Sequence, residues 1–139
     1  MGFVYILVGA LAVIATWSFA DRIRLARHRG ISREAFIAEF LKENVPPEIP
    51  AAVYDHYRSL SRAKRFSVAP DDSFEKVFGQ CHEDIDDDAE ELARKLNVEL
   101  PIETVLREWP TPLQTLRDMV LWLNWIRQQQ TKAHTRPVR

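Results

Sequence analysis

Residues 84–96 read DIDDDAEELARKL, and the spacing of their apolar side chains predicts a helix. Those side chains recur every three or four positions, which places them on one face of an α-helix: Ile85, Ala89, Leu92, Ala93 and Leu96. The acidic residues lie mostly in the first half, where negative charge is favoured by the helix dipole. We expect the helix to start at Asp84 and to end at Asn97, which tolerates the left-handed conformation of a C-cap.

Two helices and a short turn are expected before this stretch. Ser32 is suited to cap the first helix, which two prolines after Val45 would end. Its apolar positions are Phe36, Ile37, Phe40 and Leu41. Pro50 would open the second helix, whose apolar positions are Val53, Tyr54, Tyr57 and Leu60. Asp72 or Ser73 would then cap a short turn that contains Phe74, Val77 and Phe78 and stops at Gly79.

Two further helices are expected after it. Val98 and Leu100 would pack inward, and Pro101 would start a short helix that reaches Trp109. For the last helix, Thr111 with Gln114 resembles a capping box around Pro112. Its apolar stripe is Leu113, Leu116, Met119, Val120, Leu123 and Ile126, with Trp122 and Trp125 beside it. No stretch reads as a strand. We therefore predict an all-α bundle of four or five helices over residues 32–127, followed by a flexible basic tail over 128–139.

A long apolar run precedes this domain. Residues 2–20 carry no charge, and a helix of that length would cover roughly 28 Å, close to the hydrocarbon thickness of a bilayer. Tyr5 and Trp17 lie near its ends, where aromatic rings favour the membrane interface. A cleavable signal peptide and a buried core helix are the alternatives. A retained transmembrane helix is favoured over both, because no basic residue precedes the run and several follow it at once.

The basic linker over residues 21–31 predicts the orientation of that helix. Its arginines are Arg22, Arg24, Arg27 and Arg29. Because positive charge next to a span stays on the cytoplasmic side, the N-terminus would face outward and the helical domain the cytoplasm. We expect a single-pass protein of the inner membrane whose arginines lie against anionic lipid headgroups.

Charge is unevenly distributed along the chain. The net charge is −1, which provides no overall electrostatic footprint for nucleic acid. Residues 70–108, however, contain thirteen acidic and four basic residues. The single cysteine, Cys81, excludes an intrachain disulfide and a multi-cysteine metal site.

Catalytic motifs are not found. The chain has no GxSxG, P-loop, GxGxxG or HExxH sequence. Asp84, Asp86 and Asp88 begin like a calcium loop, but alanine and lysine then replace the required glycine and glutamate. Cys81 and His82 are adjacent, and neighbouring residues seldom point at one atom. His28, His56 and His134 read as surface residues, and Tyr54, Tyr57, Trp109, Trp122 and Trp125 as core. We expect no metal, no cofactor and no enzymatic activity.

Residues 71–101, DDSFEKVFGQCHEDIDDDAEELARKLNVELP, resemble an acyl carrier protein. Phe78-Gly79 resembles the first turn of that family, Asp86 to Leu96 its acidic second helix, and Leu96 to Pro101 the turn that follows. The resemblance covers most of residues 32–127 and implies a four-helix carrier fold.

The resemblance fails at the serine that carries phosphopantetheine in the family. Alignment back from Pro101 places His82 at that position, and histidine has no hydroxyl for the phosphodiester. Ser73 is followed by an apolar residue as in the family motif, but it lies too far upstream and reads better as a helix cap. We therefore expect no attached acyl chain.

The acidic helix suggests a different role. In the family this helix meets basic patches on partner enzymes, and the corresponding residues are Glu83, Asp84, Asp86, Asp87, Asp88, Glu90 and Glu91. Clustered charge of one sign steers association and sets partner choice. We expect a membrane-anchored, non-catalytic adaptor that docks a basic protein. Four alternatives remain: acids that only provide solubility, an accessory subunit of a membrane complex, a true carrier modified at an atypical residue, and a small enzyme that uses Cys81 or His82.

Overall fold

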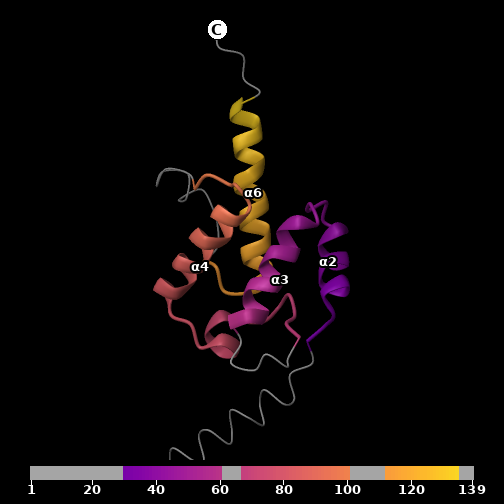
Figure 1. Cartoon of the computed structure of the whole chain (residues 1–139), viewed down its shortest axis with the longest axis vertical. Coiled ribbons are helices and arrows are strands. Elements are labelled where there is room, and N and C mark those ends of the chain that lie inside the picture. Colours follow the sequence, from indigo (N-terminus) through magenta and orange to yellow (C-terminus); the bar gives the residue numbers. More distant parts are fainter. Residues whose placement is uncertain (1–29, 61–66, 101–111, 135–139) are drawn as a thin grey trace, which may run out of the picture.

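The computed structural model describes residues 30–60, 67–100 and 112–134, and within these ranges the protein is all-α (Figure 1). The elements are α2 (Arg33–Leu41), α3 (Glu48–Leu60), the π-helical turn η1 (Phe74–Phe78), α4 (His82–Lys95) and α6 (Leu116–His134). The only β-type pairing in the described ranges is an isolated bridge between Ser73 and Thr115. The all-α prediction is confirmed.

The predicted membrane helix lies outside the described residues, as do the expected helix over 102–109 and the Thr111 cap. Among the helices of the described ranges, none combines the length and apolar character needed to cross a bilayer.

The central element is α3, which contacts α2, α4 and α6 (Figure 1). This position requires apolar side chains over much of its circumference. Its buried residues are Ile49, Pro50, Val53, Tyr54, His56 and Tyr57. The helix begins at Glu48, two residues before the predicted start at Pro50. Proline is tolerated there because the first-turn amides have no intrahelical partner.

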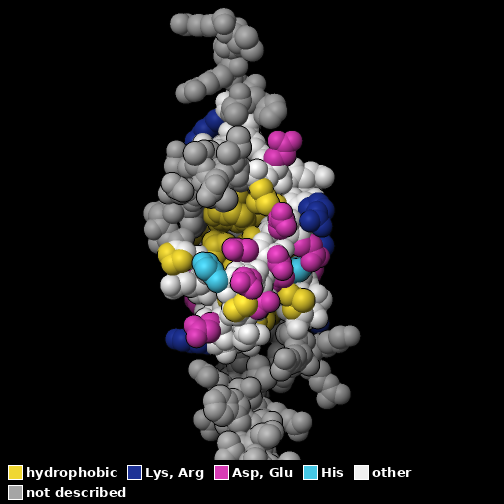
Figure 2. All heavy atoms as spheres, turned by 90° about the vertical axis from the view of Figure 1, so that its left-hand side faces the viewer, with side chains coloured by type: hydrophobic (Ala, Val, Ile, Leu, Met, Phe, Trp, Pro, Cys, Tyr) yellow, Lys and Arg dark blue, Asp and Glu magenta, His cyan; other side chains and the backbone are white. Residues whose placement is uncertain are grey.

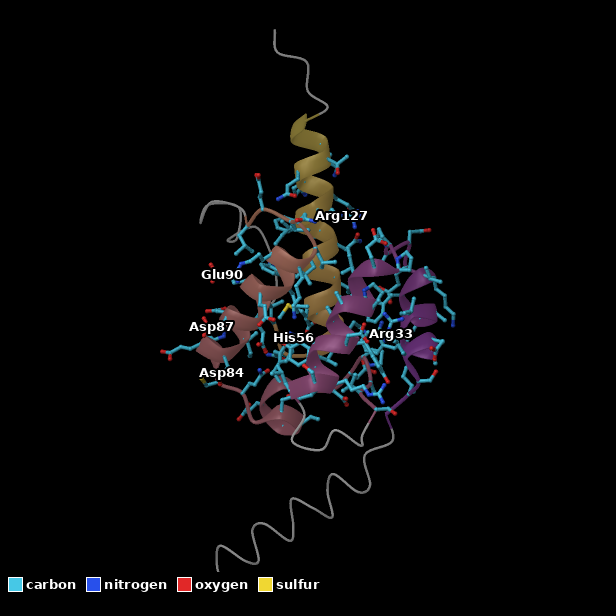
Figure 3. All side chains as sticks on the ribbon, in the orientation of Figure 1. Arg33, His56, Asp84, Asp87, Glu90 and Arg127 are labelled. Carbon is cyan, nitrogen blue, oxygen red and sulfur yellow. The ribbon has the colours of Figure 1, made fainter. Side chains whose placement is uncertain are left out.

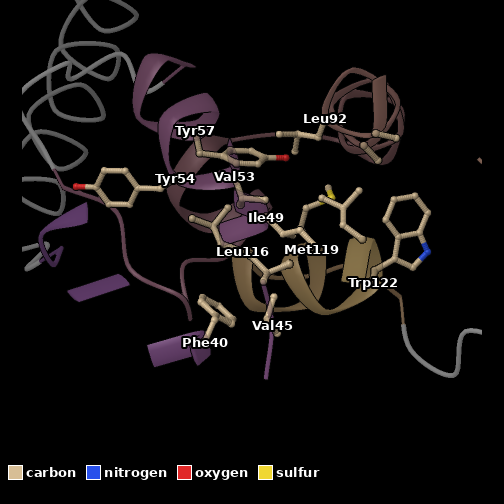
Figure 4. Close-up of a cluster of buried hydrophobic side chains, with 14 of the residues drawn as sticks. Phe40, Val45, Ile49, Val53, Tyr54, Tyr57, Leu92, Leu116, Met119 and Trp122 are labelled. Carbon is tan, nitrogen blue, oxygen red and sulfur yellow. The ribbon is translucent and has the colours of Figure 1, made fainter. Parts of the chain in front are cut away.

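The core lies between α3 and its three neighbours (Figure 4). Aromatic rings link α2 to α3, since the Phe36 ring lies 5.1 Å from Phe40 and 5.3 Å from Tyr54. Leu92 of α4 and Met119 of α6 are fully buried against the same cluster. Burial of each such side chain contributes about 1.5–3 kcal/mol. The expected aromatic core is confirmed for Tyr54, Tyr57 and Trp122, while Trp125 is half-buried.

Several predicted helix ends are confirmed. The Ser32 hydroxyl accepts a hydrogen bond from the Ala35 amide at 3.1 Å and caps α2. Ser73 caps η1, and Gly79 ends it with a φ of 68°. Asn97, with a φ of 53°, follows the end of α4.

The start of α4 differs from the prediction. The helix begins at His82, and the Asp84 carboxylate accepts a hydrogen bond from the Cys81 amide at 2.9 Å. Asp84 therefore lies at the third position of the helix and caps it from there, instead of being its first residue. The reason is that a carboxylate at this position satisfies an amide that would otherwise have no partner.

The bounds of α6 also differ. The helix starts at Leu116, and the cap is Thr115, whose amide and hydroxyl both donate to the Asp118 carboxylate at 2.9 Å. Pro112 and Gln114 precede the helix. At its other end α6 continues to His134, so the helix extends beyond residue 127, where the bundle was predicted to end. The Gln130 side chain donates to the Glu99 carbonyl, which joins the extension to the segment that follows α4.

Three leucines expected in the core are exposed at element ends. Leu41 is 50%, Leu60 47% and Leu100 40% exposed. Leu41 and Leu60 are the last residues of α2 and α3, and Leu100 ends a described range. The helical spacing identifies the apolar face of a helix, but it does not show at which residue a neighbouring helix stops covering that face.

Arg117 connects three parts of the domain. Its guanidinium binds Glu43 at 2.8 Å, Asp71 at 3.1 Å, and also Glu39. The same group lies 5.4 Å above the Phe40 ring. The start of α6 is thereby joined to α2 and to the turn before η1.

Gly30 and Ile31, the first residues that the structure describes, lie beside Ser67 and Val68. The Ile31 amide donates to the Val68 carbonyl at 3.2 Å. A Cβ atom on Gly30 would lie 1.7 Å from the Ser67 carbonyl oxygen, so only glycine fits at this crossing.

Candidate functional site: the acidic helix

Four acidic side chains form an exposed row along α4. They are Glu83, Asp86, Asp87 and Glu90, and we call this row the outer stripe. Their spacing of three and four residues places them on one face of the helix. Figure 3 shows Asp87 and Glu90 pointing away from the other helices. Within the described part of the chain, none of the four forms an ion pair.

The face of the molecule that carries α4 is strongly acidic (Figure 2). Acidic side chains gather near its centre, and lysines and arginines lie toward its margins. Opposite the outer stripe, Ile85, Ala89, Leu92 and Ala93 are buried, as predicted. The helix is therefore anchored by one face and presents carboxylates on the other.

Asp88 does not belong to the exposed surface, although the sequence predicted it there. Its side chain is 13% exposed, and its Oδ1 lies 2.9 Å from His56 Nε2. Its Oδ2 accepts a hydrogen bond from the Gln80 amide at 2.5 Å. The reason is its place on the helix, because Asp88 lies on the flank of α4 that faces α3. Asp88 is therefore part of the α3–α4 junction.

His56, expected at the surface, is also buried in this junction. Its side chain is 4% exposed. A signal in the sequence could have revealed this, because His56 follows Val53 by three residues and adjoins Tyr57 in the apolar stripe of α3. A histidine inside such a stripe is carried inward with its neighbours, and its polar atoms then require partners.

Two other acids of α4 have partners within the domain. Glu91 pairs with the Lys95 ammonium at 2.6 Å, and its carboxylate lies 3.8 Å from His56 Nδ1. The Lys95 hydrogen bond and the charge of His56 lower the pKa of Glu91. Asp84 caps the helix, and the hydrogen bond from the Cys81 amide lowers the pKa of its carboxyl.

Burial and hydrogen bonding act in opposite directions at Asp88. Burial raises the pKa of this carboxyl, but hydrogen bonds from His56 and Gln80 and the charge of His56 outweigh that effect and lower it. Burial, followed by the charge of Asp88, raises the pKa of the Tyr57 hydroxyl.

The other predicted site residues are not brought together into a reactive centre. Cys81 and His82 are both exposed at the start of α4. The Ser73 hydroxyl accepts from the Lys76 amide at 3.3 Å. Across the residues that the structure describes, no three His, Cys, Asp or Glu side chains are arranged to hold a metal ion. Six residues predicted at the membrane interface lie outside the described ranges: Tyr5, Trp17, Arg22, Arg24, Arg27 and Arg29.

Comparisons with known proteins identify no relative: no family model, no curated protein and no solved structure matches this chain.

Proposed function

We propose that this protein is a membrane-anchored, non-catalytic adaptor whose helical domain, similar to an acyl carrier protein, docks a basic partner protein. The docking surface is the outer stripe of α4. The observation that carries this proposal is that, among the described residues, the acids of α4 fall into two groups, one with partners inside the domain and one without. Asp84, Asp88 and Glu91 have partners within the domain, whereas the outer stripe has none in the described ranges.

The outer stripe contains two pairs of like charges that destabilise the isolated helix. Glu83 and Asp87, like Asp86 and Glu90, are separated by four residues. Each like-charge pair at this spacing destabilises a helix by about 0.2–0.5 kcal/mol. A basic partner would turn this repulsion into attraction. Rim charges of this kind govern the association rate and the salt dependence of a complex.

Two observations support an adaptor without a phosphopantetheine arm. His82, the residue at the position of the carrier serine, is the first residue of α4 and has no hydroxyl. Ser73 lies outside α4, where its hydroxyl caps η1. The mass of the protein is therefore expected to stay unchanged after co-expression with a phosphopantetheinyl transferase. An adduct on Ser73 would instead establish a true carrier.

Docking is tested by photo-crosslinking in native membranes. A photoreactive amino acid replaces Arg94, which is exposed one turn after Glu90 on the same face. This position leaves every acid of the outer stripe in place. The same amino acid at Glu34 on α2 is the positional control. A discrete crosslinked product is expected from position 94 and not from position 34, and it should weaken as the salt concentration rises.

Charge reversal then tests the outer stripe itself. Asp86→Lys, Asp87→Lys and Glu90→Lys together should abolish the product. The matched control reverses three exposed acids outside α4, which changes the net charge equally: Glu34, Glu75 and Glu99. The control should keep the product. If the product survives reversal of the outer stripe, or is absent from position 94, the acids serve solubility and the docking proposal is wrong. A native gel in mild detergent separates a free adaptor from a fixed subunit of a larger complex.

A further inference from the structure

The junction between α3 and α4 contains a buried histidine between two carboxylates. His56 Nε2 lies 2.9 Å from Asp88, and its Nδ1 lies 3.8 Å from Glu91. The histidine comes from α3 (Figure 3) and both carboxylates come from α4, so the contact spans the junction. Neither carboxylate belongs to the outer stripe.

This arrangement suits the charged form of the histidine. Neutral imidazole has one N–H group and one lone pair, whereas imidazolium has two N–H groups. Because both ring nitrogens of His56 face carboxylate oxygens, a neutral ring would turn a lone pair toward Asp88 or Glu91. The imidazolium avoids that repulsion and adds charge attraction at both nitrogens.

The groups around His56 keep their charge states near neutral pH. The pKa values of Asp88 and Glu91 are lowered, so both remain carboxylates. The pKa of Tyr57 is raised, so its hydroxyl, on the ring 5.1 Å from that of His56, stays neutral. The loop before α4 adds the uncharged amide of Gln80, which binds Asp88.

A further charge near the junction is the Lys95 ammonium, which pairs with Glu91. Histidine is the side chain whose charge ordinarily changes between about pH 5 and pH 8. Among the described residues that face this junction, His56 is the only histidine, so it is the group whose charge is expected to change.

We propose that His56 is a protonation-dependent latch that holds α4 against α3. When His56 carries its proton, α4 is held at Asp88 and Glu91. When His56 loses the proton, the buried charge of Asp88 is left facing a neutral ring, which stabilises it less. The helix α4 then separates from α3 more often. The latch does not require the docking function, but it sets how firmly the helix that carries the outer stripe is seated.

Amide hydrogen exchange of the full chain in mild detergent tests the latch. Measured rates are converted to protection factors, which removes the intrinsic effect of pH on exchange. A contact with a charged partner stabilises more than one with a neutral partner, so protection of the α4 amides should fall roughly tenfold between about pH 5.5 and pH 8. The amides of α2 serve as the internal reference, because α2 is joined to α3 by Arg33 and Asp55 and not by His56.

Two variants identify the responsible histidine. His56→Gln should remove the pH dependence of α4 protection, whereas His82→Gln, a matched change at an exposed position of α4, should keep it. A pH dependence that survives in His56→Gln overturns the proposal. A second measurement needs no variant: the ring carbon signal of His56 in the unmodified protein should change over the same pH range in which protection of the α4 amides falls. A ring that keeps one charge state across that range also overturns the latch.

Discussion

The sharpest prediction compares two neighbouring aspartates that look equivalent in the sequence. Asp88→Asn should destabilise the domain by about 2 kcal/mol, because a hydrogen bond or close contact to a charged group contributes about 1.5–3 kcal/mol. The Asp88 side chain is 13% exposed, so solvent screens the interaction only weakly. Asparagine preserves the shape of the side chain and keeps one oxygen that accepts from Gln80, so the loss of stability reports the contact with His56. The melting temperature should fall by about 10 °C.

Asp87→Asn is the matched control. Asp87 is exposed and forms no ion pair with the described residues, and its removal weakens repulsion within the outer stripe while losing a favourable charge near the start of the helix. These effects oppose each other, so the free energy of unfolding should change by less than about 0.5 kcal/mol. Thermal and chemical unfolding, followed by circular dichroism, measure both variants.

The pH dependence of this difference has a definite sign. The pKa of Asp88 is lowered by folding, so its contribution to stability is present above the ordinary aspartate pKa of about 4. This contribution is lost as the pH falls through the lowered pKa that Asp88 has in the folded protein. The original protein and Asp88→Asn should therefore differ at pH 6 and converge in strong acid. Equal stability of the Asp87 and Asp88 variants at pH 6 would refute the assignment of Asp88 to the junction.

Three further predictions concern the rest of the fold. Gly30→Ala should destabilise the domain by at least about 2 kcal/mol, because the new Cβ atom would overlap the Ser67 carbonyl. Gly79→Ala should lower the stability by only about 1–2 kcal/mol, which is the cost of placing alanine in the left-handed conformation. Arg117→Met should destabilise by about 1–2 kcal/mol, because the side chain is 27% exposed and its three carboxylate partners repel one another once it is gone. Leu92→Ala should lose about 2–5 kcal/mol, because the side chain is fully buried. Unfolding by denaturant measures all four variants.

Asparagine separates the two glycine effects. Gly79→Asn should recover most of the stability lost in Gly79→Ala, since asparagine tolerates a positive φ and the surrounding space is open. Gly30→Asn should remain as damaging as Gly30→Ala, and recovery there would show that the crossing adapts. For Arg117 and Leu92, the exposed Leu41 is a suitable reference. A loss no larger than that of Leu41→Ala would contradict the roles assigned to them.

Local signals in the sequence predicted most of the helices that the structure describes. The apolar spacing of α3, α4 and α6 placed their buried faces correctly. Caps at Ser32 and Ser73 and left-handed ends at Gly79 and Asn97 were also predictable, because each depends on one residue and its nearest backbone. The start of α6 was missed, because Thr115 with Asp118 competes with the equally plausible signal of Thr111 with Gln114.

The candidate site was predictable only in outline. An acidic helix could be identified from residues 84–96, and so could the opposition of its charged and apolar faces. The partition of its acids was not predictable, since Asp87 and Asp88 have the same chemistry and differ by one position on the helix. Their difference arises because α3 presents His56 to one flank of α4.

The all-α class, the order of the helices and the excess of negative charge on α4 depend on interactions within a few residues, so they can be read from the chain before it is folded. The burial of His56, the contacts of Asp88 and Glu91 with it, and the lack of an ion pair in the outer stripe within the described part of the chain follow from the packing of the helices. Helical spacing identifies faces, whereas the packing of α4 on α3 determines which charges lose water and require partners.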